Sequence, residues 1–220
     1  MSVSLDGVLV KKGNQQETFT REQLEDFAAC AHPKTGPFYF LKNYFNIQHP
    51  VKGKLLYKAY DYQIKLLHTY HNHRFNINML PRQTGKTTTA AGYLLWRAMF
   101  VPDSIILIAA HKYAGAQEIM QRIRYAYELC PNHIRAGVTS YNKGSIEFDN
   151  GSRIIAQATT ENTGRGLSIS LLYCDEFAFV RPSIAKEFWT SISPTLATGG
   201  SAIITSTPNS DEDQFALLWR

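Results

Sequence analysis

Residues 78–90 read NMLPRQTGKTTTA and join two segments of different periodicity. Residues 74–80 alternate apolar and polar side chains, which predicts a β-strand, and residues 86–100 carry apolar side chains at helical spacing, which predicts a helix. The backbone N–H groups at the start of a helix attract anions. A glycine and a lysine at this junction, Gly85 and Lys86, therefore predict a loop that binds phosphate groups.

The loop departs from the usual pattern GxxxxGK[ST], because Leu80 stands where that pattern has its first glycine. Gly85 lets the backbone turn closely around a phosphate, Lys86 brings an ammonium group to the outer phosphates, and the Thr87 hydroxyl is a ligand for Mg²⁺. Arg82 adds a second cation. The residues expected to contact a nucleotide are Pro81, Arg82, Gln83, Thr84, Gly85, Lys86, Thr87 and Thr88. Taken alone, a Gly-Lys-Thr sequence at a helix start could also occur by chance.

A second apolar segment, residues 170–174, ends in the carboxylates of Asp175 and Glu176. The carboxyl ends of parallel strands face the crevice in which ligands bind. We therefore expect Asp175 to hold Mg²⁺ and Glu176 to orient and deprotonate an attacking water molecule as a general base. The alternative is an ordinary acidic strand end on the surface. The phosphate-binding loop upstream argues against it, so the two segments together predict a site for ATP and Mg²⁺.

Strand and helix patterns alternate through most of the chain. Continuous apolar runs predict buried parallel strands, and helical spacing predicts the helices between them; the strands are 104–110, 170–174 and 201–206, and the helices 60–72, 113–129 and 183–192. Residues 145–159 are predicted to form a β-hairpin around Asn150-Gly151, a dipeptide that favours a type I′ turn. The order predicts an α/β fold of the P-loop NTPase type, ASCE or RecA-like, with a parallel sheet covered by helices on both faces.

The predicted division of the chain falls near residue 60. Residues 1–59 are expected to form an N-terminal extension or lid, a small helical and aromatic subdomain, and residues 60–220 the P-loop core. The sequence TREQ from Thr20 has the form of a capping box and predicts a helix start. Residues 33–58 mix proline, glycine and aromatic residues and give no assignable pattern. Residues 214–220 resemble an amphipathic helix that stops partway, which predicts a fragment of a longer protein.

Composition indicates a soluble globular protein, since 44% of the 220 residues are apolar and 19% are charged. The net charge of +5 permits contact with nucleic acid without requiring it. Three widely spaced cysteines, Cys30, Cys130 and Cys174, favour free thiols in a reducing compartment over a disulfide framework or a zinc site. No apolar run reaches the roughly 18 residues that a membrane-spanning helix needs.

A third apolar strand, residues 201–206, leads into Thr207-Pro208-Asn209, where hydroxyl and amide groups can hydrogen-bond a γ-phosphate. With this segment the chain resembles the large terminase subunits of tailed bacteriophages, especially those of the T-even type. The resemblance covers about residues 38–220. It rests on four segments in order: Tyr62-Gln63, the loop 81–87 without its first glycine, Gly164-Arg165-Gly166 leading into 172–180, and the segment 205–209.

The resemblance implies a motor that hydrolyses ATP with Mg²⁺ and moves double-stranded viral DNA into a procapsid. It implies four partners: DNA, the portal protein, the small terminase subunit, and further copies of the chain in a homo-oligomeric ring, expected to be a pentamer. The expected place of action is the host cytoplasm, during assembly, with no membrane partner. Large terminases also carry a nuclease domain, and no nuclease activity is expected of these 220 residues.

The resemblance also implies roles for single residues. Gln63 would hydrogen-bond the adenine edge, and the segment Thr205, Ser206 and Thr207 would couple hydrolysis to movement of a following subdomain. Arg165 would act as an arginine finger in the site of a neighbouring subunit. Arg82 is the competing catalytic arginine, acting within its own loop, and the sequence does not choose between them. For Gln63 an exposed polar helix position, and for Arg165 a surface charge on a loop, stay open as alternatives.

Two other functions fit parts of the sequence. A helicase or translocase with a glutamine upstream of its phosphate loop would share the acidic pair, but no second RecA-like domain follows here. A nucleotide-binding assembly module without hydrolysis is the other, and Glu176 argues against it. If the catalytic arginine comes from a neighbour, the chain alone is expected to be a weak ATPase.

Overall fold

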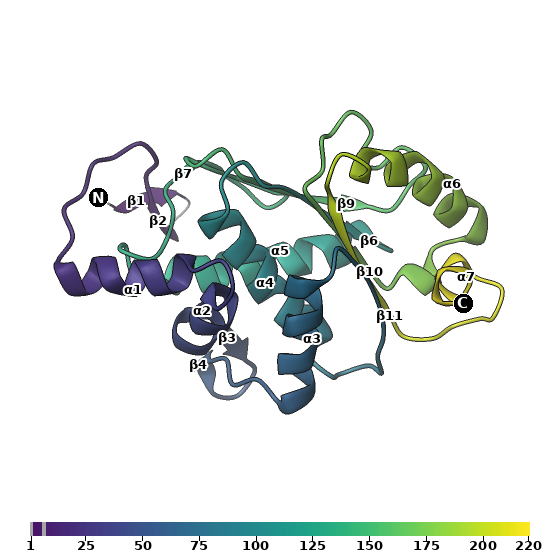
Figure 1. The fold of residues 1–220 in the computed structure, drawn as a ribbon, viewed down its shortest axis with the longest axis horizontal. Coiled ribbons are helices and arrows are strands. Elements are labelled where there is room, and N and C mark those ends of the chain that lie inside the picture. Colours follow the sequence, from purple (N-terminus) through teal and green to yellow (C-terminus); the bar gives the residue numbers. More distant parts are fainter. Residues whose placement is uncertain (1, 6–7) are drawn as a thin grey trace.

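The computed structural model describes residues 2–5 and 8–220, and its central feature is a seven-stranded sheet (Figure 1). The strand order is β5 (Phe75–Met79), β11 (Ser201–Ser206), β10 (Leu171–Asp175), β6 (Ile105–Ala110), β9 (Arg153–Ala158), β8 (Ser145–Phe148) and β7 (Val138–Tyr141). The first five strands are parallel, whereas β8 and β7 are antiparallel. The predicted parallel sheet is confirmed, and β7 is an edge strand that the sequence pattern did not predict.

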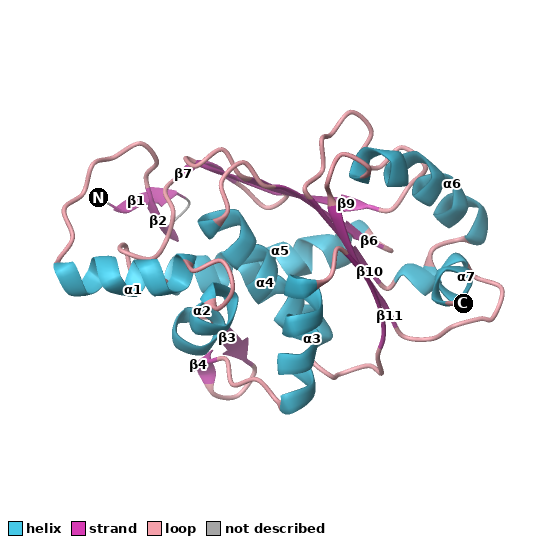
Figure 2. Cartoon of the chain, viewed as in Figure 1, coloured by secondary structure: helices cyan, strands magenta, loops and turns pink. Residues whose placement is uncertain are grey.

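Helices cover both faces of this sheet, as Figure 2 shows. One face carries α3 (Asp61–Asn72), α4 (Lys86–Phe100) and α5 (Tyr113–Leu129), and the other carries α6 (Pro182–Ile192) and α7 (Gln214–Trp219). Successive side chains of β6 alternate between the two cores, with Ile106 and Ile108 in the larger core and Leu107 in the smaller. Because both faces are buried, the central strands are continuous apolar runs.

Helix ends follow the local sequence. α1 (Arg21–Ala31) begins after Thr20, whose side chain accepts a hydrogen bond from the backbone N–H of Gln23. The Gln23 side chain accepts the Thr20 N–H in return, so the predicted capping box is present. The C-terminal helix α7 begins after Asp213, whose carboxylate accepts the N–H of Ala216 at 2.8 Å. Both caps satisfy backbone donors that a helix start leaves without partners.

The segment without an assignable pattern, 33–58, contains α2 (Gly36–Tyr44) and a hairpin of β3 (Asn46–His49) and β4 (Gly53–Leu56). This hairpin forms a sheet of its own, as does the N-terminal pair β1 (Ser2–Leu5) and β2 (Val8–Lys11). Figure 1 places these elements on one side of α4, away from α6 and α7.

Tight packing joins α1 and α2 to α4. The Trp96 indole N–H donates to the carbonyl of Cys30 at 2.8 Å. A Cβ atom added to Gly92 would lie 2.9 Å from the ring of Phe45, so only glycine lets this ring approach the helix so closely. The N-terminal elements therefore pack directly on the helix that begins at Lys86.

The predicted hairpin at 145–159 is present as β8 and β9, but its turn is not of type I′. A type I′ turn needs positive φ at both central residues. Only Gly151 has one, at 84°, and the Asn150 side chain donates to the carbonyls of Ala98 and Met99 instead. The connection is longer than two residues because Asn150 is used to hold the end of α4.

All three cysteines are buried free thiols, as their spacing predicted. Burial raises the pKa of the Cys30 and Cys130 thiols to about 12, so both stay protonated at neutral pH. Within the described residues, every helix is too short or too polar to span a bilayer.

Candidate functional site

The carboxyl ends of three neighbouring strands meet at one edge of the sheet. β11 lies between β5, which leads into the predicted phosphate loop, and β10, which ends in Asp175. In this register Thr205 pairs with Asp175 on one side and with Asn78 on the other. The strand order therefore gathers the loop, the acidic pair and the segment 205–207 in one place.

The loop that follows β5 is tied to the sheet and opens directly into a helix. The N–H of Leu80 donates to the carbonyl of Ser206 at 3.1 Å, and the Thr84 hydroxyl donates to the carbonyl of Pro81. Gly85 has φ of 71° and Gln83 has φ of 61°, both in the left-handed region that favours glycine. α4 starts at the next residue, so its unpaired N–H groups border the loop, as phosphate binding requires.

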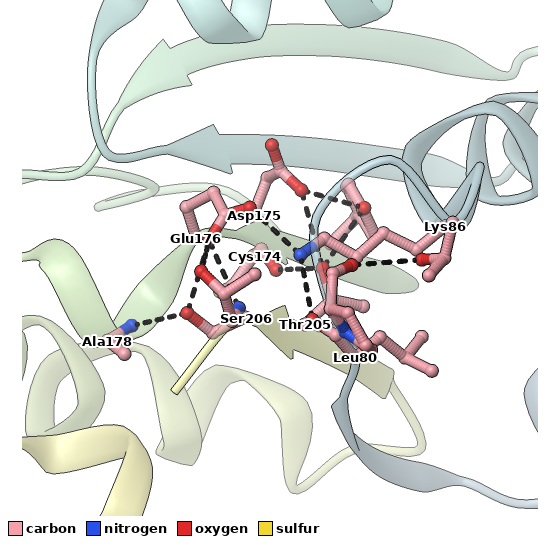
Figure 3. A network of polar contacts seen from close by, with 12 residues as sticks. Leu80, Lys86, Cys174, Asp175, Glu176, Ala178, Thr205 and Ser206 are labelled. Carbon is pink, nitrogen blue, oxygen red and sulfur yellow. Dashed lines mark hydrogen bonds and ion pairs between the residues drawn. The ribbon is translucent and has the colours of Figure 1, made fainter. Parts of the chain in front are cut away.

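Lys86 and Glu176 form an ion pair across the site, with 2.9 Å between Nζ and Oε1 (Figure 3). The lysine is buried and its ammonium group also lies 3.4 Å from the carbonyl oxygen of Leu80. A buried ammonium group is costly unless a charge or hydrogen bonds compensate it. Glu176 supplies that charge here, so the two segments that the sequence singled out are in direct contact.

Glu176 is held in a fixed position from its other side by the segment that follows β11. Its Oε2 accepts the Thr207 N–H at 3.2 Å and the Thr207 hydroxyl at 3.0 Å. The residue has φ of 51°, a conformation uncommon for a non-glycine residue, which turns the chain directly after β10. Burial alone would raise the pKa of Glu176, but Lys86 and Thr207 together hold that pKa below its ordinary value.

Asp175 has a different environment. Its Oδ1 accepts the hydroxyl of Tyr173 at 3.1 Å and lies 3.4 Å from the hydroxyl of Thr205. Burial raises the pKa of this carboxyl group, and the neighbouring Glu176 charge raises it further, against the opposing effects of the two hydroxyls and Lys86. A bound cation would offset that penalty. Carboxylate and hydroxyl oxygens such as those of Asp175 and Thr87 are the ligands that Mg²⁺ prefers, so these residues fit the ion.

Gln63 is buried against the outside of the phosphate loop. This burial excludes the alternative that Gln63 is an exposed polar residue of its helix. Its amide N–H donates to the carbonyl of Thr84 at 3.0 Å, and its amide oxygen accepts the N–H of Tyr60. The hydroxyl of Tyr62 donates to the same Thr84 carbonyl. A Cβ atom at Gly85 would lie 2.5 Å from the Gln63 amide nitrogen. In this structure Gln63 therefore fixes the loop backbone.

The two candidate catalytic arginines differ in their surroundings. Arg82 is exposed, and its guanidinium lies 5.9 Å from the ring centroid of Phe179. Phe179 belongs to the short helix that follows Glu176. Arg165 is exposed between Gly164 and Gly166, and among the described residues its side chain has no hydrogen-bond or ion-pair partner. Arg82 is thus placed beside the site of its own chain, whereas Arg165 is available to another molecule.

Thr88, also expected at the nucleotide, is contacted from a neighbouring helix. Its hydroxyl accepts a hydrogen bond from Arg122 of α5 at 2.7 Å, and Glu118 pairs with the same guanidinium. Two cavities flank this first turn of α4. One of about 570 Å³ includes Thr88 and Arg122, and one of about 630 Å³ includes Gln63 and Thr89.

Sequence reasoning missed three side chains at this site. Tyr173 could have been found, because it lies two residues before Asp175 and so on the same side of β10. The sequence pattern contains Tyr62 beside Gln63 but indicates no role for it. Phe179 contacts Arg82 only because the chain turns after Glu176, and no local sequence pattern indicates this contact.

Comparison with known families identifies a match over most of this region. The family described as "Terminase large subunit, T4likevirus-type, N-terminal" matches residues 77–220. The matched region includes the phosphate loop, the acidic pair and all of β11.

Solved structures of similar fold are also large terminases. A variant of the Thermus phage P74-26 large terminase ATPase domain has a TM-score of 0.60 and 22% identity, over 72% of this chain and 68% of that one. The bacteriophage HK97 large terminase has a TM-score of 0.67 and 19% identity, over 91% of this chain and 40% of that one. The large terminase of thermophilic bacteriophage D6E, solved in complex with ADP, has a TM-score of 0.51 and 13% identity, over 69% and 39%. The chain thus spans about two fifths of the HK97 and D6E proteins.

Proposed function

The chain belongs to the T4-like family of terminase large subunits, and from this premise we propose that it hydrolyses ATP to drive double-stranded DNA into a viral procapsid. The observation that carries the proposal is the contact between Lys86 and Glu176 at the carboxyl edge of the sheet. It joins a phosphate-binding loop to a candidate general base. The ADP complex of the D6E terminase supports an adenine nucleotide as the substrate.

Nucleotide binding would rearrange the ion pair. The γ-phosphate competes with Glu176 for the Lys86 ammonium group, because both are anions and the phosphate carries more charge. Once Lys86 has turned to the phosphate, Glu176 loses its strongest partner while Thr207 still holds its Oε2. The carboxylate then becomes a stronger base, at the moment when substrate is in place.

Hydrolysis needs positioning and charge neutralisation more than covalent chemistry by the protein. Glu176 accepts a proton from the attacking water, whose oxygen bonds to the γ-phosphorus as the bond from that phosphorus to the bridging oxygen breaks. Lys86 and Arg82 neutralise charge on the phosphoryl oxygens. Thr87 and Asp175 would hold Mg²⁺, which supplies further charge neutralisation when bound.

The finer assignments extend the same proposal. Thr205, Ser206 and Thr207 would pass the state of the site to the segment that follows, since Thr207 touches Glu176 and Thr205 touches Asp175. Arg165 would complete the site of a neighbouring copy in a ring. Duplex DNA, the portal protein and the small terminase subunit would be the other partners, in the host cytoplasm.

The test is ATP turnover by three purified proteins: the parent chain, Lys86→Ala and Glu176→Gln. We expect both variants to lose at least 90% of the parent's turnover, and Glu176→Gln to retain nucleotide binding because it keeps Lys86. A matched control, Lys186→Ala, removes an exposed lysine on α6 and should turn over ATP at the parent rate. Equal turnover in the parent and Glu176→Gln would exclude this residue as the base.

A further inference from the structure

Most of the net positive charge of this chain comes from one short segment. Residues 42–65 contain five lysines and one aspartate, a net charge of +4 within a chain whose net charge is +5. The rest of the chain therefore carries only one excess positive charge. All five lysines are exposed: Lys42, Lys52, Lys54, Lys58 and Lys65. Such local excess is the electrostatic signature of a surface that meets a polyanion.

Two of these lysines border one hollow, and a third lies on the adjoining face of β4. The cavity of about 630 Å³ between α2, β4 and α3 is bordered by Lys42 and Lys58. Leu56 borders it too, and Lys54 lies on the same side of β4 as Leu56 because side chains two residues apart share a strand face. We call Lys42, Lys54 and Lys58 the lysine face.

The ammonium groups of the lysine face are available to a ligand. Within residues 2–5 and 8–220, none of the three forms an ion pair, whereas Lys11 and Lys86 both do. Asp61 is the one acidic residue of the segment. Lysines that the protein leaves unneutralised on one surface repel each other, and a polyanion removes that cost.

We propose that the lysine face contacts the phosphate backbone of double-stranded DNA, an inference that rests on the proposed function. Duplex DNA presents one negative charge per about 1.7 Å of its axis, so exposed lysines that share a surface can each meet a separate phosphate. The surface adjoins the nucleotide site, because Gln63 borders the same hollow and holds the carbonyl of Thr84.

The test compares binding of a fluorescent 30-base-pair duplex to the parent and to two triple variants with equal loss of charge. One is Lys42→Ala, Lys54→Ala, Lys58→Ala. The matched control is Lys34→Ala, Lys143→Ala, Lys186→Ala, which removes three exposed lysines elsewhere. For the first variant we expect a Kd at least tenfold higher, and a slope of log K against log salt concentration that is smaller by about 3. For the control we expect the Kd to change less than twofold.

Two control measurements and two contrary outcomes complete the test. The lysine-to-arginine triple variant at 42, 54 and 58 should retain parent affinity, since it keeps the charge, and all variants should keep the parent's ATP turnover without DNA. If the parent binds the duplex and both alanine variants weaken binding equally, only total charge matters and the lysine face is excluded as the contact. If the parent does not bind duplex DNA at all, the DNA partner of the proposed function fails, whatever the ATP turnover.

Discussion

Lys86 and Glu176 form an ion pair, with 2.9 Å between Nζ and Oε1, although they are far apart in the sequence. Lys86 begins α4, and Glu176 directly follows β10. The pair compensates the charge of a buried ammonium group and holds the pKa of Glu176 below its ordinary value, which makes it a weaker base. A nucleotide that takes Lys86 therefore both fills the phosphate loop and releases Glu176.

Acid stability tests the environment of Glu176. Because its pKa is lowered in the folded state, the group contributes stability that is complete above its unfolded pKa, near 4.5, and is lost as pH falls through the folded value. We expect Glu176→Gln to remove that part of the acid dependence. Urea unfolding between pH 3 and pH 7 measures it. An acid dependence identical to that of the parent would show that the ion pair does not form in solution.

The pKa of Asp175 is shifted in the opposite direction to that of Glu176. Its pKa is raised by burial, so the ionised carboxylate is a cost to folding that is present at neutral pH and relieved as pH falls. Without nucleotide or Mg²⁺, Asp175→Asn should therefore unfold at a higher temperature than the parent at pH 7, while losing at least 90% of ATP turnover. A melting temperature below that of the parent would contradict the cost of burying this charge.

Thr207 is expected to position Glu176 for catalysis. Thr207→Val removes the hydroxyl 3.0 Å from Oε2, a hydrogen bond to a charged group worth about 1.5–3 kcal/mol. We expect kcat to fall roughly tenfold, and the acid limb of the pH profile of kcat/KM to move to higher pH because the carboxylate loses a donor. Thr207→Ser keeps the hydroxyl and should show the parent's kcat and pH profile. An acid limb that does not shift in Thr207→Val would show that Thr207 has only a structural role.

Gln63 and Gly85 form a coupled pair behind the phosphate loop. Gly85→Ala adds a Cβ 2.5 Å from the Gln63 amide at a φ of 71°, and Gln63→Ala removes the two backbone contacts. Each should raise the KM for ATP severalfold and lower the free energy of unfolding by about 1–2 kcal/mol. In the double variant the shortened side chain at position 63 no longer clashes with the added Cβ. Its free energy of unfolding should therefore fall by less than the sum of the two single losses.

The two arginines are distinguished by protein concentration. Arg82 lies beside Phe179 of its own chain, so Arg82→Ala should lower turnover per chain at least tenfold at every concentration. Arg165 is exposed on its loop, so Arg165→Ala should lower turnover only where chains associate. Turnover is measured from dilute to concentrated protein beside the oligomeric state. A concentration-independent loss in Arg165→Ala would assign it to its own site.

Much of this site could be predicted from local sequence. Gly85, Lys86 and Thr87 lie at a strand-to-helix junction, and Asp175 and Glu176 follow a buried strand, so each segment has its chemistry in its immediate neighbours. The capping box at Thr20 and the helix α5 were predictable for the same reason. Each depends on residues within one turn or one strand.

Other features depend on contacts between distant segments. The Asn150-Gly151 pair favours a tight turn locally, but the Asn150 side chain is held by the carbonyls of Ala98 and Met99, and the turn widens. The hairpin of β3 and β4 has no strong strand pattern and is held by packing against α2 and α5. Edge strand β7 likewise depends on its pairing with β8 and on the bridge between Lys12 and Val138.

The sequence alone determined which residues carry charge and hydroxyl groups at the ends of strands, because periodicity and turn chemistry act over a few residues. Tertiary structure decided which of these groups meet. Insertion of β11 between β5 and β10 places Thr207 against Glu176 and Lys86 opposite it, and the same packing buries Gln63 behind the loop. The physical reason is that strand order is set by burial of both sheet faces, a property of the whole chain that no single segment contains.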